Sequence, residues 1–411
     1  MQPNNGEQRP SLETAEAPER LETPQAPGAL EAARADADPE FDSEGAPRVA
    51  LTRKTVIGSI LMVVVIVAFL YFGLPRLVGV GTEVKKLQDG NIWWLIAAAV
   101  LKIASFVGYI ALFRAVFVHR MTAAGAARLT WKVSYEITMA GLAATRVFAA
   151  AGAGGIVLTV WALLRAGLDS RLVAARMIAF NVILYGVYMA ALVVFGLGLY
   201  LGLFSGEAPF AVTVVPAAVG AAVIVLVLSI AALPSDFENL VAHWARGTGG
   251  GRFAKLARRL ATVPASAAQG VRTTLQLIRT GDPSLLGALV WWFCDIATLW
   301  ACFHAFGAAP PDAVIVMAYF VGWIANTLPT PGGIGTVEGG LIGTFAAFGV
   351  PTSTAVIAVL AYRVFSFWLP TPPGVVAYFQ LRRTVNRWRE EPLPTSGLQP
   401  ESTLEPGSAT G

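Results

Sequence analysis

Charged residues are scarce in this chain. Asp, Glu, Lys and Arg make up 14% of its 411 residues, whereas hydrophobic residues make up 55% and the mean hydropathy is +0.61. A soluble domain carries roughly 25% charged residues, so this shortage excludes an ordinary soluble protein and predicts an integral membrane protein. Residues 51–389 contain 26 bases and 11 acids, a balance typical of basic cytoplasmic loops beside anionic lipid rather than of nucleic-acid binding.

Cysteine and histidine are also rare. The two cysteines, Cys294 and Cys302, lie in one apolar segment, where a helix would separate them by roughly 12 Å along its axis, too far for a disulfide. His119, His243 and His304 are scattered, and no spacing of Cys, His and acidic residues is typical of a metal site. We therefore expect no metal and no cofactor. Because no nucleotide-binding loop is present, we also expect no direct use of ATP.

Apolar runs of about 20 residues, the length that spans a bilayer, occur repeatedly. The expected spans are 55–74, 92–118, 177–203, 210–233, 284–307 and 352–380. Two longer apolar stretches, 133–164 and 312–349, are interrupted by glycine or proline clusters and predict helix-break-helix units. The sequence thus predicts an all-α polytopic membrane protein with about six full spans and two re-entrant hairpins.

Polar segments flank this membrane domain. Residues 1–50 and 390–411 are rich in Pro, Glu or Ser and predict disordered tails around a domain of residues 51–389. The basic segment 234–283 predicts a cytoplasmic linker. Within it, 252–279 has an amphipathic pattern that fits either an interfacial helix or a linker helix packed on the bundle.

Basic residues indicate the orientation of the spans. They cluster before the first span, at 119–132, at 165–176, in the 234–283 linker and at 382–389, which predicts cytoplasmic N- and C-termini. The first interrupted unit then enters and leaves on the cytoplasmic side, and the second on the outer side. Arg76, Lys85 and Lys86 in the first outer loop go against the rule.

The two interrupted units resemble each other. Ala151–Ile156 can be laid on Pro329–Ile334, and Arg165–Ser170 on Ala347–Thr352. This places Gly154 opposite Gly332 and Gly167 opposite Gly349. In each second pair a glycine would end one helix, and Asp169, Ser170 or Thr352 would cap the next. With the opposite orientations, this predicts an inverted repeat whose hairpins meet near mid-membrane. The alternative is a chance similarity between Gly/Ala-rich helices that pack closely.

Charged groups at membrane depth indicate a site. Pro329–Leu341 breaks a membrane helix and contains Glu338, while Arg146 and Arg363 lie in other apolar segments. We expect Glu338 to pair with one arginine and the other to meet an anionic group. The candidate ligand-binding or gating residues are Arg146, Gly154, Gly155, Pro329, Pro331, Gly332, Gly333, Gly335, Glu338 and Arg363. The glycines would lend backbone N–H donors at half-helix N-termini.

Other buried charges allow further hypotheses. Asp295 is a mid-span acid that could belong to a proton path, whereas Lys102 and Glu136 lie nearer segment ends and are expected to snorkel. The alternative to a ligand site is a closed polar knot of Arg146, Arg363 and Glu338 that only holds the hairpins together.

The segment Leu328–Leu341, followed by Gly349–Pro351 and Tyr362-Arg363, resembles the signature of the lysylphosphatidylglycerol synthase transmembrane family. This family is also called flippase-like, or uncharacterised family 0104, and includes the flippase domain of the multiple peptide resistance factor. The similarity extends over roughly 50–385. Members often carry a proline before the first glycine cluster and a Glu–Arg pair after it, but Ala149–Ala151 and Trp161–Arg165 stand here. Only the second-half residues are therefore carried over from the resemblance.

The resemblance implies lipid translocation in a bacterial plasma membrane, with aminoacylated phosphatidylglycerol as the best-known cargo. We expect no synthase domain, because only about 30 residues follow the last expected span. The leading hypothesis is a non-enzymatic flippase for an anionic, aminoacylated or polyprenyl-phosphate-linked lipid. One alternative is a scaffold for a separate synthase or other cell-envelope enzyme, and homo-oligomers are also compatible. A second alternative is an integral-membrane transferase, which the scattered acidic loop residues favour less.

Overall fold

The computed structural model describes residues 90–119, 124–147, 153–232, 268–307, 309–328, 330 and 333–390. The chain divides into a unit of Met1–Arg48 and a unit of Val49–Gly411. The first unit lies outside the described residues. So do the expected span at 55–74, most of the 234–283 linker and the tail after Glu390. The following description concerns the second unit.

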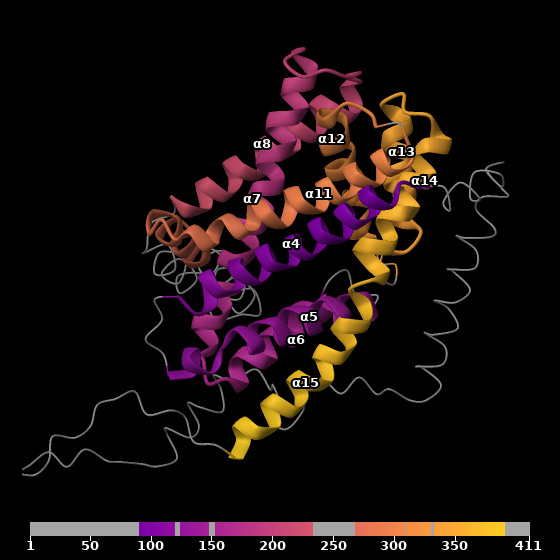
Figure 1. Cartoon of the computed structure of the whole chain (residues 1–411). Coiled ribbons are helices and arrows are strands. Elements are labelled where there is room, and N and C mark those ends of the chain that lie inside the picture. Colours follow the sequence, from indigo (N-terminus) through magenta and orange to yellow (C-terminus); the bar gives the residue numbers. More distant parts are fainter. Residues whose placement is uncertain are drawn as a thin grey trace, which may run out of the picture. The chain divides into compact units, whose positions relative to one another are not determined.

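All regular structure in the described part of the chain is helical (Figure 1). In chain order the helices are α4 (Ile92–Phe117), η3 (Ala124–Arg128), α5 (Trp131–Val147), α6 (Ala153–Arg165), α7 (Ser170–Tyr200), α8 (Phe210–Ala231), η4 (Pro283–Leu286), α11 (Gly287–Ala305), α12 (Asp312–Trp323), η5 (Ile324–Thr327), α13 (Thr336–Ala347), α14 (Thr352–Arg363), the π-turn η7 (Val364–Trp368) and α15 (Thr371–Glu390). Residues 268–279 are also helical.

Five helical stretches within these residues are long and apolar enough to cross a membrane. They are Ile92–Phe117, Ser170–Tyr200, Phe210–Ala231, Pro283–Ala305 and Thr352–Trp388. They confirm the all-α membrane fold and five of the six expected spans. The last stretch has 37 residues, or about 56 Å of helix, and therefore extends well beyond a hydrocarbon core of about 30 Å.

The two interrupted units form hairpins of short helices. α5 packs on α6, and α12 packs on α13. The four helices have 17, 13, 12 and 12 residues, which is fewer than the roughly 20 that a full span requires. The glycine and proline breaks in 133–164 and 312–349 predict re-entrant hairpins, and a re-entrant hairpin consists of two adjacent short helices.

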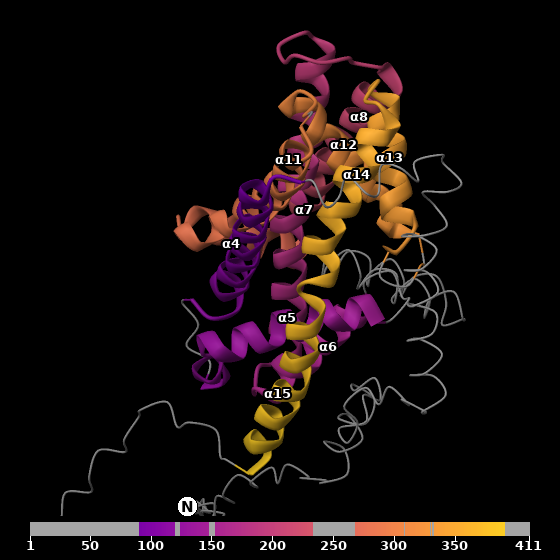
Figure 2. The same cartoon turned by 45° about the vertical axis from the view of Figure 1, so that its right-hand side comes forward.

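The hairpins open at opposite ends of this unit (Figure 2). Gly125, just before α5, is packed so closely on the end of α6 that a Cβ there would lie 2.7 Å from the carbonyl oxygen of Ala166. A Cβ at Gly349, just after α13, would lie 2.7 Å from a carboxylate oxygen of Glu207, in the loop that follows α7. Because α7 runs from the α6 end to this loop, the two openings lie at opposite ends of α7.

The basic connections gather at the first of these ends. The guanidinium of Arg128 lies 5.8 Å from the ring of Trp388 near the end of α15, and His119, after α4, forms a 2.7 Å ion pair with Asp282 before α11. The described parts of the 119–132, 165–176 and 382–389 segments and Asp282 thus share one end. This agrees with the charge pattern, and the assignment of that end to the cytoplasm stays a prediction.

Both hairpins are followed by the same turn. At the end of α6, Gly167 has φ +96° and the amide of Leu168 donates to Leu163. At the end of α13, Gly349 has φ +74° and the amide of Val350 donates to Phe345. These are Schellman turns at a constant offset of 182 residues, as the proposed alignment of the hairpin ends requires.

The next helices are capped differently. The Asp169 carboxylate accepts from the amides of Arg171 and Leu172 at the start of α7, as expected. The expected cap at Thr352 is wrong: the N-cap of α14 is Pro351, without a side-chain hydrogen bond. Pro351 has φ −55°, a value that the proline ring fixes and that suits the start of a helix. No side-chain acceptor is therefore needed to fix the direction of the chain.

The two halves pack on each other reciprocally. α4 packs along α11, its counterpart in the repeat. α5 of the first hairpin packs on α15, and α12 of the second packs on α7, so each hairpin packs on a long helix that follows the other hairpin. Gly108 and Gly287 allow α4 and α11 to approach closely, since a Cβ at Gly108 would lie 2.9 Å from the carbonyl oxygen of Gly287. This reciprocal packing supports the internal repeat.

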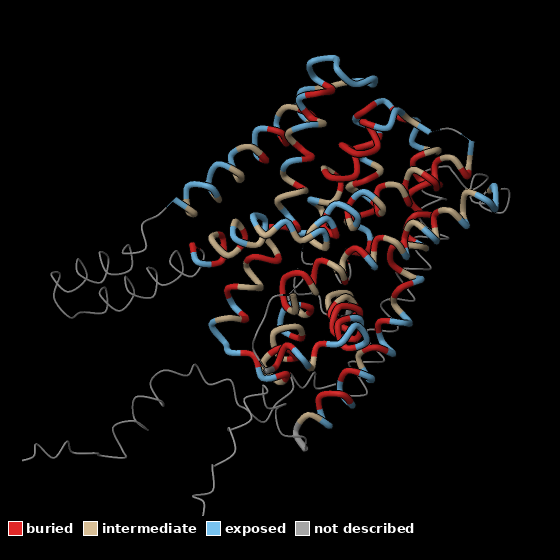
Figure 3. Tube along the Cα trace, turned by 60° about the vertical axis from the view of Figure 1, so that its left-hand side comes forward, coloured by how far each residue is buried: buried red, intermediate tan, exposed pale blue. Residues whose placement is uncertain are grey.

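Apolar side chains also cover the outside. On α4, Ile96, Val100, Ile103 and Val107 recur at helical spacing and are exposed, and Figure 3 shows buried and exposed residues alternating around the long helices. A wide exposed apolar face is stable only against lipid or another protein. The surface is therefore that of a membrane protein.

Candidate functional site

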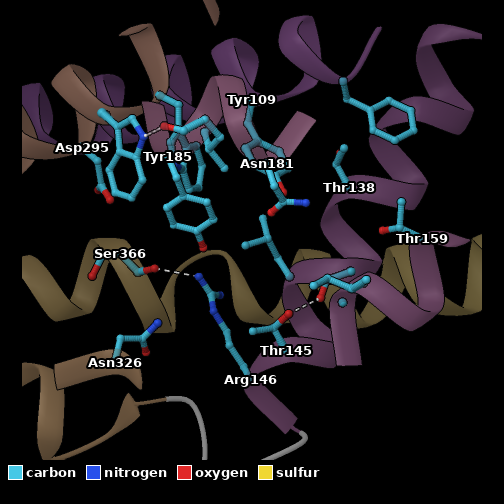
Figure 4. Close-up of a pocket in the computed structure, with 18 of the residues that line it drawn as sticks. Tyr109, Thr138, Thr145, Arg146, Thr159, Asn181, Tyr185, Asp295, Asn326 and Ser366 are labelled. Carbon is cyan, nitrogen blue, oxygen red and sulfur yellow. Dashed lines mark hydrogen bonds between the residues drawn. The ribbon is translucent and has the colours of Figure 1, made fainter. Parts of the chain in front are cut away.

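A cavity of about 280 Å³ lies between the tips of the two hairpins (Figure 4). Thr145 and Gly155 line it from the first hairpin, and Trp323, Asn326 and Gly333 line it from the second. Parts of α4, α7, α11 and the α14–α15 region complete the wall. The two hairpins open at opposite ends, and residues on both sides of each break line one cavity inside the bundle.

Arg146 extends from the last turn of α5 toward Ser366 (Figure 4). Its Nη1 donates to the carbonyl oxygen of Phe367 at 3.0 Å and to Oγ1 of Thr371 at 2.9 Å, and its Nη2 donates to the carbonyl oxygen of Ser366 at 2.7 Å. No carboxylate among the described residues lies within ion-pair distance of this guanidinium. Arg146 is therefore a half-buried cation held by neutral groups.

A proline explains why those carbonyls need a donor. In a continuous α-helix the amide of residue 370 would bond to the carbonyl of Ser366, but Pro370 has no N–H. The helix instead passes through the π-turn η7, in which the amide of Leu369 donates to Val364 at 2.8 Å. Arg146 thus satisfies a carbonyl that the proline break leaves free.

Glu338 and Arg363 form a buried ion pair at the cavity wall. Nε of Arg363 lies 2.6 Å from Oε1 of Glu338, and the two side chains are 6% and 4% exposed. The second oxygen, Oε2, accepts the amide of Gly335 at 2.7 Å and so caps α13. Gly335 has φ +84°, a conformation that favours glycine. The expected pairing of Glu338 with one arginine is confirmed, and its partner is Arg363.

Asp295 lies in a second buried network of the wall. Its Oδ1 accepts Nζ of Lys102 at 2.7 Å, and its Oδ2 accepts the hydroxyls of Tyr319 at 2.8 Å and Tyr362 at 3.2 Å. Lys102 also faces the ring of Trp291, 5.1 Å from its centroid. Asp295 is therefore fully occupied by a cation and two hydroxyls.

The prediction that Lys102 and Glu136 snorkel is wrong. Lys102 is 3% exposed and Glu136 is 1% exposed. Lys102 is paired with Asp295, and Glu136 accepts the hydroxyl of Thr384 on α15 at 2.9 Å. Each side chain is buried because a polar partner on another helix satisfies it there. Position in the sequence alone does not reveal such partners.

The structure separates the predicted site residues into three groups. Arg146, Gly155, Gly333, Arg363 and Asp295 line the cavity, whereas Gly154, Gly335 and Glu338 are not part of its lining. Pro329, Pro331 and Gly332 lie outside the described residues. Two expected roles change: the amide of Gly335 is used by Glu338, and Gly155 lies where helices cross, since a Cβ there would be 2.7 Å from the carbonyl oxygen of Gly141.

The closed-knot alternative describes only part of the arrangement. Arg363 and Glu338 form a pair of that kind, but Arg146 has its own partners on η7 and α15. In addition, the indole N–H of Trp323 at the cavity wall is buried and has no hydrogen-bond partner among the described residues. Buried donors are normally satisfied, so this one indicates a place for a ligand or water.

Aromatic residues of the wall were missed by the sequence interpretation. Tyr109, Tyr185, Trp291 and Trp292 line the cavity. The sequence signal that could have identified this part of the wall is Lys102, which lies ten residues inside an expected span. A charge at that depth requires a partner within the protein.

No three His, Cys, Asp or Glu side chains come together as a metal site in the described ranges. Cys294 and Cys302 are both free, in agreement with their spacing.

Comparison with known proteins identifies similar sequences. The family profile described as "Lysylphosphatidylglycerol synthase TM region" matches residues 56–374. A "UPF0104 membrane protein" of Methanothermobacter thermautotrophicus is 36% identical over 87 residues, 21% of this chain and 25% of that protein. Another from the same organism is 24% identical over 200 residues, 46% of this chain and 57% of its own length.

A UPF0104 membrane protein of Methanocaldococcus jannaschii is 30% identical over 94 residues, 23% of this chain and 28% of that protein. The matched stretches therefore span from a quarter to just over half of these relatives. The names of these relatives state no ligand and no reaction.

Proposed function

This chain belongs to the lysylphosphatidylglycerol synthase transmembrane family, and we propose that it moves a phosphate-bearing lipid between the two leaflets of its membrane. The observation that carries the proposal is the cavity between the hairpin tips, whose wall contains Arg146 without a carboxylate partner among the described residues. A guanidinium at such a site suits phosphate oxygens because its fork of donors matches their spacing.

The position of the cavity fits a path between leaflets. Each hairpin is open toward one end of the bundle, and the two tips meet at the cavity. Broken helices that meet near mid-membrane are typical of transporters in which one half rocks against the other. The headgroup would pass through the cavity, and the acyl chains would stay in the bilayer beside the exposed apolar helix faces. We propose a plasma-membrane location with cytoplasmic termini, and no catalytic step.

The test is lipid exchange in proteoliposomes. Fluorescent phosphatidylglycerol is placed in both leaflets, the outer fluorophore is quenched chemically, and the quenched fraction is followed in time. We expect wild type to expose inner-leaflet lipid well above the rate in protein-free vesicles. Arg146→Gln should lower that rate at least about tenfold, the factor that corresponds to losing roughly 1.4 kcal/mol of headgroup interaction.

The matched control is Arg171→Gln. Arg171 is exposed in the first turn of α7. Its replacement removes the same charge away from the cavity, so a general effect of losing one positive charge would appear in this variant too. Equal rates in Arg146→Gln and wild type, with both folded by size-exclusion chromatography, would contradict a headgroup site at Arg146. No exchange by wild type would favour the scaffold hypothesis.

A further inference from the structure

The charges on the cavity wall do not cancel. The cations of the lining are Lys102, Arg146 and Arg363, and its carboxylate is Asp295. Lys102 is paired with Asp295, and Arg363 is paired with Glu338 just behind the wall. Within the described residues, Arg146 therefore leaves a surplus of one positive charge at the cavity.

The sequence that joins the described helices of each hairpin adds no charge. Residues 148–152, 329 and 331–332 contain no charged residue. Among the described residues, the positive charge of Arg146 thus has no acid to balance it. A partly buried charge without a counterion is costly, so an anion that enters the cavity is stabilised there.

Arg146 also keeps donors for such an anion. A guanidinium has five N–H groups, and three hydrogen bonds reach Ser366, Phe367 and Thr371. Two N–H groups thus have no acceptor in the described part of the protein. The unpartnered indole N–H of Trp323 lies at the same cavity. The two N–H groups of Arg146 and the indole N–H of Trp323 are thus hydrogen-bond donors without an acceptor among the described residues.

An additional ammonium group would find no free carboxylate among the described residues of the wall. Both oxygens of Asp295 are already bonded to Lys102, Tyr319 and Tyr362, and both oxygens of Glu338 are bonded to Arg363 and Gly335. The ring of Trp291 already faces the ammonium of Lys102, and the guanidinium of Arg146 lies at the same wall. A second cation there would be repelled.

We propose that the cavity selects a headgroup with a net charge of −1, a phosphodiester with a neutral substituent, and rejects an aminoacylated headgroup with a net positive charge. This inference rests on the proposed lipid movement and narrows its substrate class. Selectivity is a difference between two affinities. The monoanion is favoured because it neutralises Arg146. The aminoacylated lipid is disfavoured because its ammonium has no free carboxylate to balance it on the described wall.

The test compares three lipids in the same proteoliposomes, each labelled on one acyl chain. They are phosphatidylglycerol with charge −1, phosphatidylcholine with charge 0, and lysyl-phosphatidylglycerol with charge +1. We expect rates that fall in this order, with phosphatidylglycerol moving at least about tenfold faster than the lysylated lipid. Equal rates for all three, or faster movement of the lysylated lipid, would overturn the selectivity while the proposed function stands. No movement of any lipid would overturn both.

A change of charge on the wall provides the second arm. Asn326 lines the cavity near the tip of the second hairpin, and Asn326→Asp is nearly isosteric but adds a carboxylate. We expect it to lower the phosphatidylglycerol rate and raise the lysylated-lipid rate, shifting their ratio at least about tenfold. Asn326→Ser is the neutral control and should keep the wild-type order of lipids. An unchanged ratio in a folded Asn326→Asp protein would contradict the charge argument.

Discussion

At the scale of single residues, the ion pair between Glu338 and Arg363 shows which part of a buried contact the sequence predicts. A carboxylate in a glycine-rich break required a cation, and the sequence contained two arginines at similar depth. The structure selects Arg363, 2.6 Å away, because α14 packs on α13, whereas Arg146 lies on α5. The need for a partner could be predicted from composition, but its identity depends on the tertiary packing.

Removing one member of this pair should cost more stability than removing both. Glu338→Ala leaves the Arg363 guanidinium buried without its carboxylate, and we expect a loss of about 3–5 kcal/mol in unfolding free energy. Glu338→Leu combined with Arg363→Met removes both charges and should recover most of that loss. Equilibrium denaturation in one detergent measures this difference. A double variant that is less stable than Glu338→Ala would contradict the account.

At the scale of elements, the break at Pro370 and the hydrogen bonds of Arg146 form one unit. Pro370→Ala supplies the missing backbone N–H, so the carbonyl of Ser366 can bond within its own helix. The stabilising effect of Arg146 should then shrink.

A double-mutant cycle tests this coupling. We expect Arg146→Gln to destabilise the protein by about 1 kcal/mol less in the Pro370→Ala background than in wild type, since residues sharing one hydrogen-bond network are not additive. Thermal unfolding of the four proteins under one condition gives the comparison. Additive effects within about 0.3 kcal/mol would mean that Arg146 does not act through the proline break.

Most element boundaries were predictable from local chemistry. Glycine and proline clusters identified the two hairpins, and the Asp169 cap and the turns at Gly167 and Gly349 followed from residue type. The cap at Thr352 was not predicted correctly, because Pro351 fixes the start of α14 by itself. Pattern also could not show that α15 continues to Glu390, since its polar half is stabilised by packing on α5.

At the scale of the whole molecule, the contacts that define the cavity join distant parts of the chain. Lys102 and Asp295 are 193 residues apart, and Arg146 and Phe367 are 221 apart. The local sequence around one residue of each pair does not specify its partner. The alignment of the two hairpins, in contrast, did predict that the hairpins meet. The repeat therefore made the position of the site predictable, but not the aromatic and tyrosine residues around it.

The central claim is that the cavity lies on a path connected to both sides of the membrane. Its most direct test is thiol accessibility of Thr159→Cys, a cavity-lining position on α6, in a Cys294→Ala/Cys302→Ala background. A small anionic methanethiosulfonate is added to the outside or the inside of oriented vesicles. Ser205→Cys, in the exposed loop after α7, reports a single side. The account predicts that the introduced thiol at position 159 reacts from both sides; reaction from one side only, or from neither, would contradict it.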